Sequence, residues 1–302
     1  MELITVKNIN KFYDKHHAVR DLSFEVNKGE IYGIIGPDGA GKTTLFRILT
    51  TLMLADSGTA FVDALDVVKD YKQIRNIIGY MPGKFSLYQD MTVEENLEFF
   101  ATVFNTTIQE NYYLIEDIYK QIEPFKNRRA GKLSGGMKQK LALSCALIHK
   151  PTVLFLDEPT TGVDPVSRKE FWEMLKRLKN QGITILVSTP YMDEAKLCDR
   201  IALMQNGRFM KVDTPKNIVS QFTETLWSVK SSKMHRLLKD LRNHPEIKTS
   251  FSFGESYHFT INETLKQEDL HEYLMNNGHS EIVINEIKPN VEDCFMQLSM
   301  EN

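Results

Sequence analysis

The feature that most constrains the fold of this chain is the segment GEIYGIIGPDGAGKTTLFRIL, residues 29–49. A short apolar run comes first, a glycine-rich turn follows, and apolar residues then recur at helical spacing. The segment has the spacing of a phosphate-binding loop, or Walker A motif: Gly36 is followed by four residues and then by Gly41, Lys42 and Thr43. A chance glycine-rich turn would not come with this flanking pattern. The segment therefore predicts a buried strand, a phosphate-binding loop and a helix.

The residue types of the loop suit a nucleotide phosphate. Glycines let successive backbone N–H groups point inward, and the loop opens onto a helix N-terminus with its partial positive charge. We expect Lys42 to reach the β- and γ-phosphates and the Thr43 hydroxyl to ligate Mg²⁺. The candidate phosphate-binding residues are Gly36, Pro37, Asp38, Gly39, Ala40, Gly41, Lys42, Thr43 and Thr44.

A second phosphate-handling element is PTVLFLDEPTTGVDP, residues 151–165. Its apolar run is typical of a parallel strand buried on both faces. At the carboxyl edge of such a sheet, Asp157 would hold Mg²⁺ and Glu158 would face the water that attacks the γ-phosphate. Acidic residues after a strand also commonly cap the next helix. The phosphate-binding loop upstream favours the catalytic interpretation and a Walker B motif.

A third element, KLSGGMKQKLALSCALIHK at residues 132–150, predicts a helix. Ser134 is a good N-cap, and Leu141, Cys145 and Ile148 form an apolar stripe at steps of three and four residues. Taken alone, the segment is another helix start able to bind an anion.

The motifs GPDGAGKTT, LSGGMKQK, VLFLDEP and TGVD, in this order, resemble those of the ATP-binding-cassette (ABC) ATPases. The resemblance covers residues 1–222 and implies an α/β P-loop NTPase domain with a mixed sheet and a helical subdomain. It also implies ATP and Mg²⁺ as cofactors and ATP hydrolysis as the reaction, with Glu158 and Lys42 as catalytic residues.

The resemblance further implies a second cassette, because in this family two cassettes pack head to tail around each nucleotide. The signature residues Ser134, Gly135 and Gly136 would then contact the γ-phosphate held by the partner, and Asp164 would lie at the seam between the sites. Tyr13 matches the aromatic residue that stacks on adenine. An ordinary strand-edge tyrosine is the alternative interpretation.

Two positions depart from the family pattern. The family usually has glutamine after GY-x-P, where this chain has Gly83, and histidine after the ST that ends a core strand, where it has Pro190. A hydrogen bond to a charged group contributes about 1.5–3 kcal/mol, so the missing histidine alone could slow hydrolysis about ten- to a hundredfold. One hypothesis is a non-identical partner cassette that carries the missing groups. The alternative is a homodimer in which a neighbour substitutes, the candidates being Lys84, Thr189 and Tyr191.

Residues of about 90–150 are expected to form the helical subdomain, which begins with a capping box at Thr92 and Glu95. In the family, this region and the loop before it receive a coupling helix from integral membrane permease subunits. The loop residues Phe85, Leu87 and Tyr88 would suit such an interface. The competing interpretation is that they pack the subdomain core.

From residue 223 onward the pattern changes. Successive segments predict a strand, a helix, a hairpin around GES, a helix, a strand and a last helix. This βαββαβ order predicts a small α+β ferredoxin-like domain over residues 223–302. No site residues stand out in it.

Composition limits the choice of partners. The net charge is −3 and no long Lys/Arg block occurs, which argues against nucleic acid as a partner. The cysteines Cys145, Cys198 and Cys294 have no pairing or metal-ligand spacing, which favours a reducing compartment. No apolar stretch is long enough to cross a bilayer, so we expect a cytoplasmic chain, peripheral to the cell membrane through its partners.

Two classes of function follow. The first is the ATPase of a membrane exporter, favoured by GYMP, TVEEN, GVDPVSR and YMDEA, which resemble cassettes of the drug- and antibiotic-exporting (ABC-2 type) group. The second is a soluble cassette acting on ribosomes or DNA, whose usual tandem cassettes, coiled coils or basic arms are not visible. Gly83 and Pro190 keep open a weakly hydrolysing, regulatory cassette. The sequence does not encode the transported substrate.

Overall fold

The computed structural model describes residues 1–262 and 265–301 of the chain. It divides into a first unit, Met1–Pro215, and a second unit that begins at Lys216. This division falls before the predicted boundary at residue 222, because α7 (Pro215–Ser220) contacts the C-terminal helix. The Sγ of Cys294 donates to the carbonyl oxygen of Ile218 at 3.7 Å.

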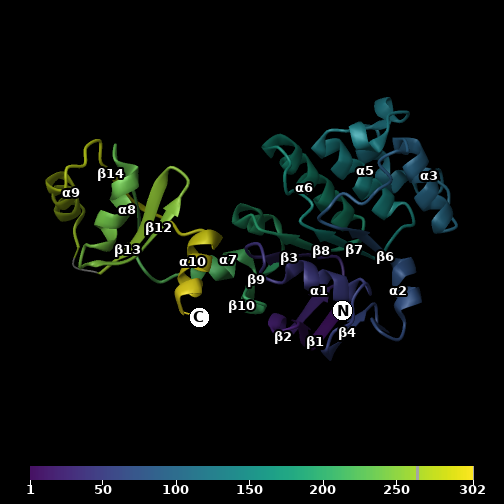
Figure 1. The fold of residues 1–302 in the computed structure, drawn as a ribbon, viewed down its shortest axis with the longest axis horizontal. Coiled ribbons are helices and arrows are strands. Elements are labelled where there is room, and N and C mark those ends of the chain that lie inside the picture. The colour runs from purple at the N-terminus through teal and green to yellow at the C-terminus, as the bar shows by residue number, and fades with distance from the viewer. Residues whose placement is uncertain (263–264, 302) are drawn as a thin grey trace. The chain divides into compact units, whose positions relative to one another are not determined.

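The first unit contains a six-stranded sheet with the strand order β10-β9-β3-β8-β7-β6 (Figure 1). The strands are β3 (Ile31–Ile35), β6 (Ile78–Met81), β7 (Val153–Asp157), β8 (Thr184–Thr189), β9 (Arg200–Gln205) and β10 (Arg208–Asp213). All neighbours are parallel except β10, which pairs antiparallel with β9. Every residue of β3, β7 and β8 is buried, which explains their apolar sequences. The carboxyl ends of these strands therefore meet at one edge of the sheet.

A second, antiparallel sheet has the order β2-β1-β4-β5 and shares a core with the first. Its strands are β1 (Glu2–Tyr13), β2 (His16–Asn27), β4 (Ser57–Val62) and β5 (Leu65–Asp66). Helix α1 (Lys42–Leu49) contributes Phe46 to this core, and the Phe46 ring meets the edge of Phe155 from β7. The core therefore fixes α1, which follows the phosphate-binding loop.

The remaining helices of the first unit cover the six-stranded sheet on its other side or flank it (Figure 1). They are α2 (Tyr71–Ile77), α3 (Val93–Val103), α4 (Tyr112–Tyr119), α5 (Gly135–Leu147) and α6 (Pro165–Asn180), with the 3₁₀ turns Glu123–Phe125, Ala130–Lys132 and Met192–Leu197. The capping box predicted at the start of α3 is confirmed, because both Thr92 and Glu95 make their reciprocal hydrogen bonds.

The second unit has the predicted βαββαβ order. Its elements are β11 (Leu226–Lys230), α8 (Met234–Arg242), β12 (Ile247–Phe253), β13 (Ser256–Ile261), α9 (Gln267–Asn276), β14 (Val283–Ile287) and α10 (Val291–Glu301). The strand order β12-β13-β11-β14, with all pairs antiparallel, confirms the ferredoxin-like fold. Its core packs Trp227 and Phe259 of the sheet against Leu237 of α8 and Leu270 of α9.

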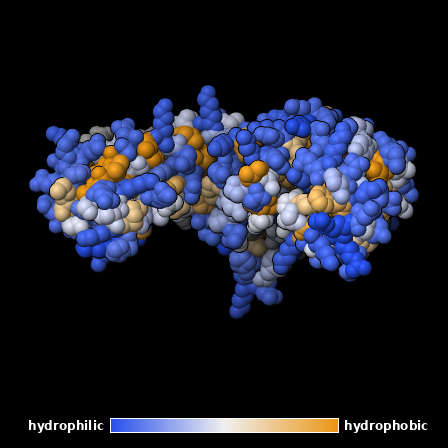
Figure 2. All heavy atoms as spheres, turned by 90° about the horizontal axis from the view of Figure 1, so that it is seen from above, coloured by the Kyte–Doolittle hydropathy of each residue, from blue (hydrophilic) through white to orange (hydrophobic). Residues whose placement is uncertain are grey.

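No helix in the part of the chain that the structure describes is both long and apolar enough to cross a bilayer. On the face shown in Figure 2, hydrophilic residues predominate and hydrophobic residues form small, separate patches.

Candidate functional site

The phosphate-binding loop runs from β3 to α1 and needs glycine at two close approaches. At Gly36 a Cβ atom would lie 2.1 Å from the carbonyl oxygen of Met204 in β9. At Gly41, where φ is +106°, it would lie 2.3 Å from the carbonyl oxygen of Ala18. No larger residue fits at either position. No side chain caps the first turn of α1, so its backbone N–H groups are available to an anion.

Lys42 begins α1, and only 3% of it is exposed. Its Nζ donates to the carbonyl oxygens of Gly36 at 2.8 Å and Pro37 at 2.9 Å, and lies 3.1 Å from Oε1 of Glu158. A buried ammonium group is tolerated because these oxygens compensate its charge. The structure therefore brings Lys42 and Glu158, which come from separate motifs, into direct contact.

Asp157 and Glu158 follow one another at the carboxyl edge of β7. The hydroxyl of Ser188 donates to Oδ1 of Asp157 at 2.7 Å and accepts from the backbone N–H of Glu158 at 3.0 Å. Burial raises the pKa of Asp157, and hydrogen bonds from Ser188 and Thr43 oppose that rise. Glu158 has φ +50°, a left-handed conformation that costs about 1–3 kcal/mol and persists where the surroundings impose it.

Thr43 and Asp157 are the residues that could hold a divalent cation, through a hydroxyl and a carboxylate, and the Thr43 hydroxyl helps to lower the pKa of Asp157. Within residues 1–262 and 265–301, no group of three His, Cys, Asp or Glu side chains is placed to bind a metal by itself. Mg²⁺ is usually held by one or two carboxylates together with waters and substrate phosphates. This donor set therefore fits Mg²⁺ bound jointly with a nucleotide.

A pocket of about 240 Å³ opens beside the loop and is lined by Tyr13 at the end of β1. Tyr13 is 41% exposed, and its hydroxyl lies 3.5 Å from Oγ1 of Thr44 and donates to Sδ of Met53 at 3.2 Å. His16 and Ala18 also line the pocket, and the sequence analysis missed both. Because His16 pairs with Tyr13 across the β1–β2 turn, recognising that hairpin would have placed it here.

The signature residues lie at the start of α5. Ser134 is the N-cap, and its Oγ accepts from the N–H of Met137 at 3.4 Å. Ser134 and Gly135 are exposed, whereas a Cβ at Gly136 would lie 2.9 Å from Oγ of Ser167. None of the signature residues lines the 240 Å³ pocket. The chain thus carries its signature helix start and its phosphate-binding loop as separate surfaces.

Asp164 is the N-cap of α6 and is exposed as well. Its Oδ1 accepts from the N–H groups of Ser167 at 3.0 Å and Val166 at 3.1 Å. These hydrogen bonds, with that of Ser167 the largest cause, lower the pKa of Asp164. Asp164 is likewise absent from the lining of the pocket.

Comparison with known proteins identifies the family. A family model described as ABC transporter matches residues 19–161. NatA of Bacillus subtilis, an ABC transporter ATP-binding protein, is 39% identical over 68% of this chain and 87% of its own length. The chain belongs to the ABC transporter family. YbhF of Escherichia coli, a probable multidrug ABC transporter ATP-binding protein, is 38% identical to this cassette over 98% of the chain. The cassette spans about half of YbhF, 52% of its length.

Solved structures of ABC proteins share the fold of the first unit. An ATP-binding subunit of an ABC transporter aligns with a TM-score of 0.67 and 28% identity over 73% of this chain and 93% of that one. A dimeric bacterial cassette aligns with a TM-score of 0.64 and 26% identity over 70% of this chain and 98% of that one. A dimeric cassette with ADP and Pi aligns at 0.63, with 25% identity over the same shares. The predicted ABC family and its ATPase-domain fold are confirmed.

Two expected γ-phosphate contacts of ABC ATPases are missing from this cassette. Gly83 lies beside the candidate magnesium ligand, because a Cβ there would lie 3.1 Å from the carbonyl oxygen of Asp157. Pro190 directly follows β8. Neither residue has a side chain able to form a hydrogen bond, so the site lacks both contacts.

Of the neighbours considered as substitutes, Thr189 has its hydroxyl engaged and Tyr191 has its ring covered. The hydroxyl of Thr189 donates to Oε2 of Glu194 at 2.5 Å. The guanidinium of Arg168 lies 4.0 Å from the ring centre of Tyr191. Thr189 is fully buried, and Lys84 is exposed. The structure therefore argues against Thr189 as the replacement for the missing histidine.

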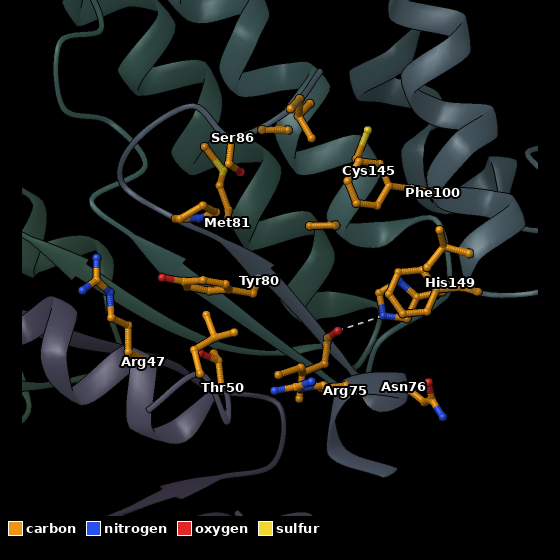
Figure 3. Close-up of a pocket in the computed structure, with 18 residues that line it drawn as sticks. Arg47, Thr50, Arg75, Asn76, Tyr80, Met81, Ser86, Phe100, Cys145 and His149 are labelled. Atoms are coloured by element: carbon orange, nitrogen blue, oxygen red, sulfur yellow. Dashed lines mark hydrogen bonds between the residues drawn. The ribbon is translucent and has the colours of Figure 1, made fainter. Parts of the chain in front are cut away.

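A larger pocket, of about 710 Å³, lies between the sheet and the helical region (Figure 3). Phe100 of α3 and Cys145 of α5 line it from one side, and Arg47 and Thr50, at the end of α1, line it from the other. His149 also lines it, and its Nε2 hydrogen-bonds the carbonyl oxygen of Ile78 at 2.8 Å. Its lining is mainly apolar.

The loop before α3 is divided between core and surface. Leu87 is buried and lines the larger pocket, as the core interpretation expects. Tyr88 is 50% exposed and meets the edge of the Phe99 ring at 4.9 Å, so an aromatic pair remains at the surface beside the pocket. Phe85 is half-buried beneath the ammonium group of Lys138.

Proposed function

We propose that this cassette binds and hydrolyses ATP to power a membrane exporter, and that it works on the cytoplasmic face of the cell membrane. The observation that carries the proposal is the contact between Lys42 and Glu158 beside the phosphate-binding loop. Relatives support the export direction: one is a probable multidrug transporter protein, and another, from Burkholderia lata, is a Nod factor export ATP-binding protein with 38% identity over 72% of both chains. The transported molecule is thus expected to be a drug or other small molecule.

In the proposed site, the backbone N–H groups of the loop and Lys42 hold the phosphates. Thr43 and Asp157 would hold Mg²⁺, which when bound neutralises charge on the phosphate oxygens. Lys42 exchanges its contact with Glu158 for phosphate oxygens as ATP enters. Glu158 is then free to accept the proton of the attacking water. Tyr13, which lines the pocket, stacks on the adenine.

A second cassette completes each site. Ser134 and Gly135 are exposed at a helix start and lie outside the pocket of their own chain, which suits contact with a γ-phosphate on a partner. Asp164, also exposed, lies at the seam. The dimeric cassette structures among the relatives support this arrangement.

Membrane subunits dock at the larger pocket. An apolar hollow of about 710 Å³ beside the exposed Tyr88 and Phe99 suits an amphipathic helix from a permease. Burial of those aromatic rings would contribute most of the binding energy.

Purification from detergent-solubilised membranes tests this proposal. We expect the tagged chain to recover an integral membrane protein, and the complex to hydrolyse ATP only when Mg²⁺ is present. Recovery of ribosomal or DNA-bound partners without any integral membrane protein would overturn the exporter assignment. Turnover that persists in excess chelator would overturn the magnesium site.

A further inference from the structure

A buried ion pair lies beside the catalytic edge of the sheet. Glu194, in the 3₁₀ helix Met192–Leu197, is 2% exposed. Its Oε1 accepts from Nε of Arg168 at 3.1 Å and from the hydroxyl of Thr160 at 2.9 Å. Its Oε2 accepts from the hydroxyl of Thr189 at 2.5 Å. Both carboxylate oxygens therefore have partners, as a buried charge requires.

Two of the residues that contact Glu194 lie close to Glu158 in the sequence or in the sheet. Thr160 lies two residues after Glu158. The hydrogen bond from its hydroxyl to Glu194 therefore holds the turn that follows Glu158. Thr189 is adjacent to Ser188, whose carbonyl oxygen and hydroxyl both accept from the backbone N–H of Glu158, at 3.1 Å and 3.0 Å. The carboxylate thus ties together the two segments that impose the left-handed conformation of Glu158.

We propose that Glu194, held by Arg168, is a positioning residue for ATP hydrolysis and keeps the Glu158 carboxylate in place. The inference rests on the proposed role of Glu158. Neither Glu194 nor Arg168 lines the nucleotide pocket. Loss of the pair therefore affects the chemical step and leaves nucleotide binding nearly unchanged.

Three variants test the proposal: Glu194→Gln, Arg168→Gln and the double variant. We expect each to lower kcat about ten- to a hundredfold, because small misplacements of a reacting group have effects of this size, with KM changed by less than about twofold. Arg168→Gln leaves the buried Glu194 carboxylate without its cation and lowers Tm, whereas Arg168 in Glu194→Gln keeps its contact with Asp193 at 3.3 Å and the neutral double variant regains Tm. A double variant with wild-type kcat would overturn the proposal, as would single variants with wild-type kcat.

Arg177→Gln is the matched control. Arg177 lies on the same helix as Arg168 and pairs with Asp117 at 3.0 Å, but both side chains are mostly exposed. Exposed pairs contribute little to stability. The control therefore keeps the kcat, KM and Tm of the wild type.

Hydrogen exchange of the nucleotide-free chain separates this inference from the proposed function. Peptides covering residues 157–162 are expected to exchange about tenfold faster in Glu194→Gln than in the wild type, and to be unchanged in Arg177→Gln. Unchanged exchange in Glu194→Gln would overturn the positioning role whatever the turnover. A wild-type complex without ATPase activity but with the expected exchange would overturn the proposed function alone.

Discussion

The phosphate-loop half and the signature half of the proposed ATP site are built differently. Lys42 is 3% exposed and contacts Glu158 within its own chain. Ser134 is exposed, and its side chain accepts a 3.4 Å hydrogen bond that caps its own helix. The first half is arranged by contacts inside one chain, whereas the second half is presented for another molecule. Variants in the two halves should therefore fail in different ways.

The largest effect is expected from Glu158→Gln in the first half. The amide cannot accept a proton from water, so turnover falls about 10²- to 10⁴-fold. ATP binding is retained, because Lys42 no longer has a carboxylate that competes with the phosphates. Steady-state turnover and equilibrium nucleotide binding measure the two effects. The control Asp117→Asn, at an exposed ion pair, changes neither. Equal loss of binding and turnover would contradict the assignment.

A smaller effect is expected from Ser134→Arg in the second half. The variant removes the hydroxyl and fills the helix start, so turnover falls about a hundredfold, the size seen when one transition-state donor is lost. The ATP affinity of the monomer is unchanged, because Ser134 lies outside the pocket of its own chain. Ser232→Arg, at an exposed serine of the second unit, serves as the control. A matching loss of monomer affinity would break the distinction between the halves.

The double variant Gly83→Gln and Pro190→His sharpens the account of the first half. It adds the two side chains that the family usually places near the γ-phosphate. We expect turnover to rise about tenfold, since each restored hydrogen bond to charge is worth about 1.5–3 kcal/mol and the Cβ at residue 83 fits tightly against Asp157. ATP turnover by the purified complex measures the gain. Turnover at or below the wild-type level would show that the chain compensates elsewhere.

The smallest effect is expected from Tyr13→Ala. Loss of an aromatic contact worth about 0.5–1.5 kcal/mol weakens ATP binding about two- to tenfold and leaves kcat unchanged. Tyr113→Ala removes a comparably exposed tyrosine on α4 and leaves affinity unchanged. Wild-type affinity in Tyr13→Ala would make Tyr13 an ordinary strand-edge residue.

Local patterns were sufficient to predict most of the fold. The apolar runs at residues 153–156 and 185–187 indicated buried strands, and the change of pattern from residue 223 indicated the second unit. The phosphate-binding loop was recognisable because its glycines, lysine and threonine are adjacent in sequence. The position of the unit boundary was not, because it depends on the contact between α7 and α10.

The contacts that join the motifs could not be read from sequence. Lys42 meets Glu158, and Thr160 meets Glu194, only after the strands pair in the order β3-β8-β7. The hydroxyl of Thr189 is a reasonable phosphate ligand by residue type, and its burial and its hydrogen bond to Glu194 exclude it. Strand order and burial are thus what the sequence patterns lacked.

The most direct test is a structure of the Glu158→Gln complex with ATP and Mg²⁺. The account predicts that Ser134 of this cassette lies within hydrogen-bonding distance, about 2.7–3.2 Å, of a γ-phosphate bound in the phosphate loop of a second cassette. A nucleotide held by one chain alone, with Ser134 remote from every γ-phosphate, would contradict it.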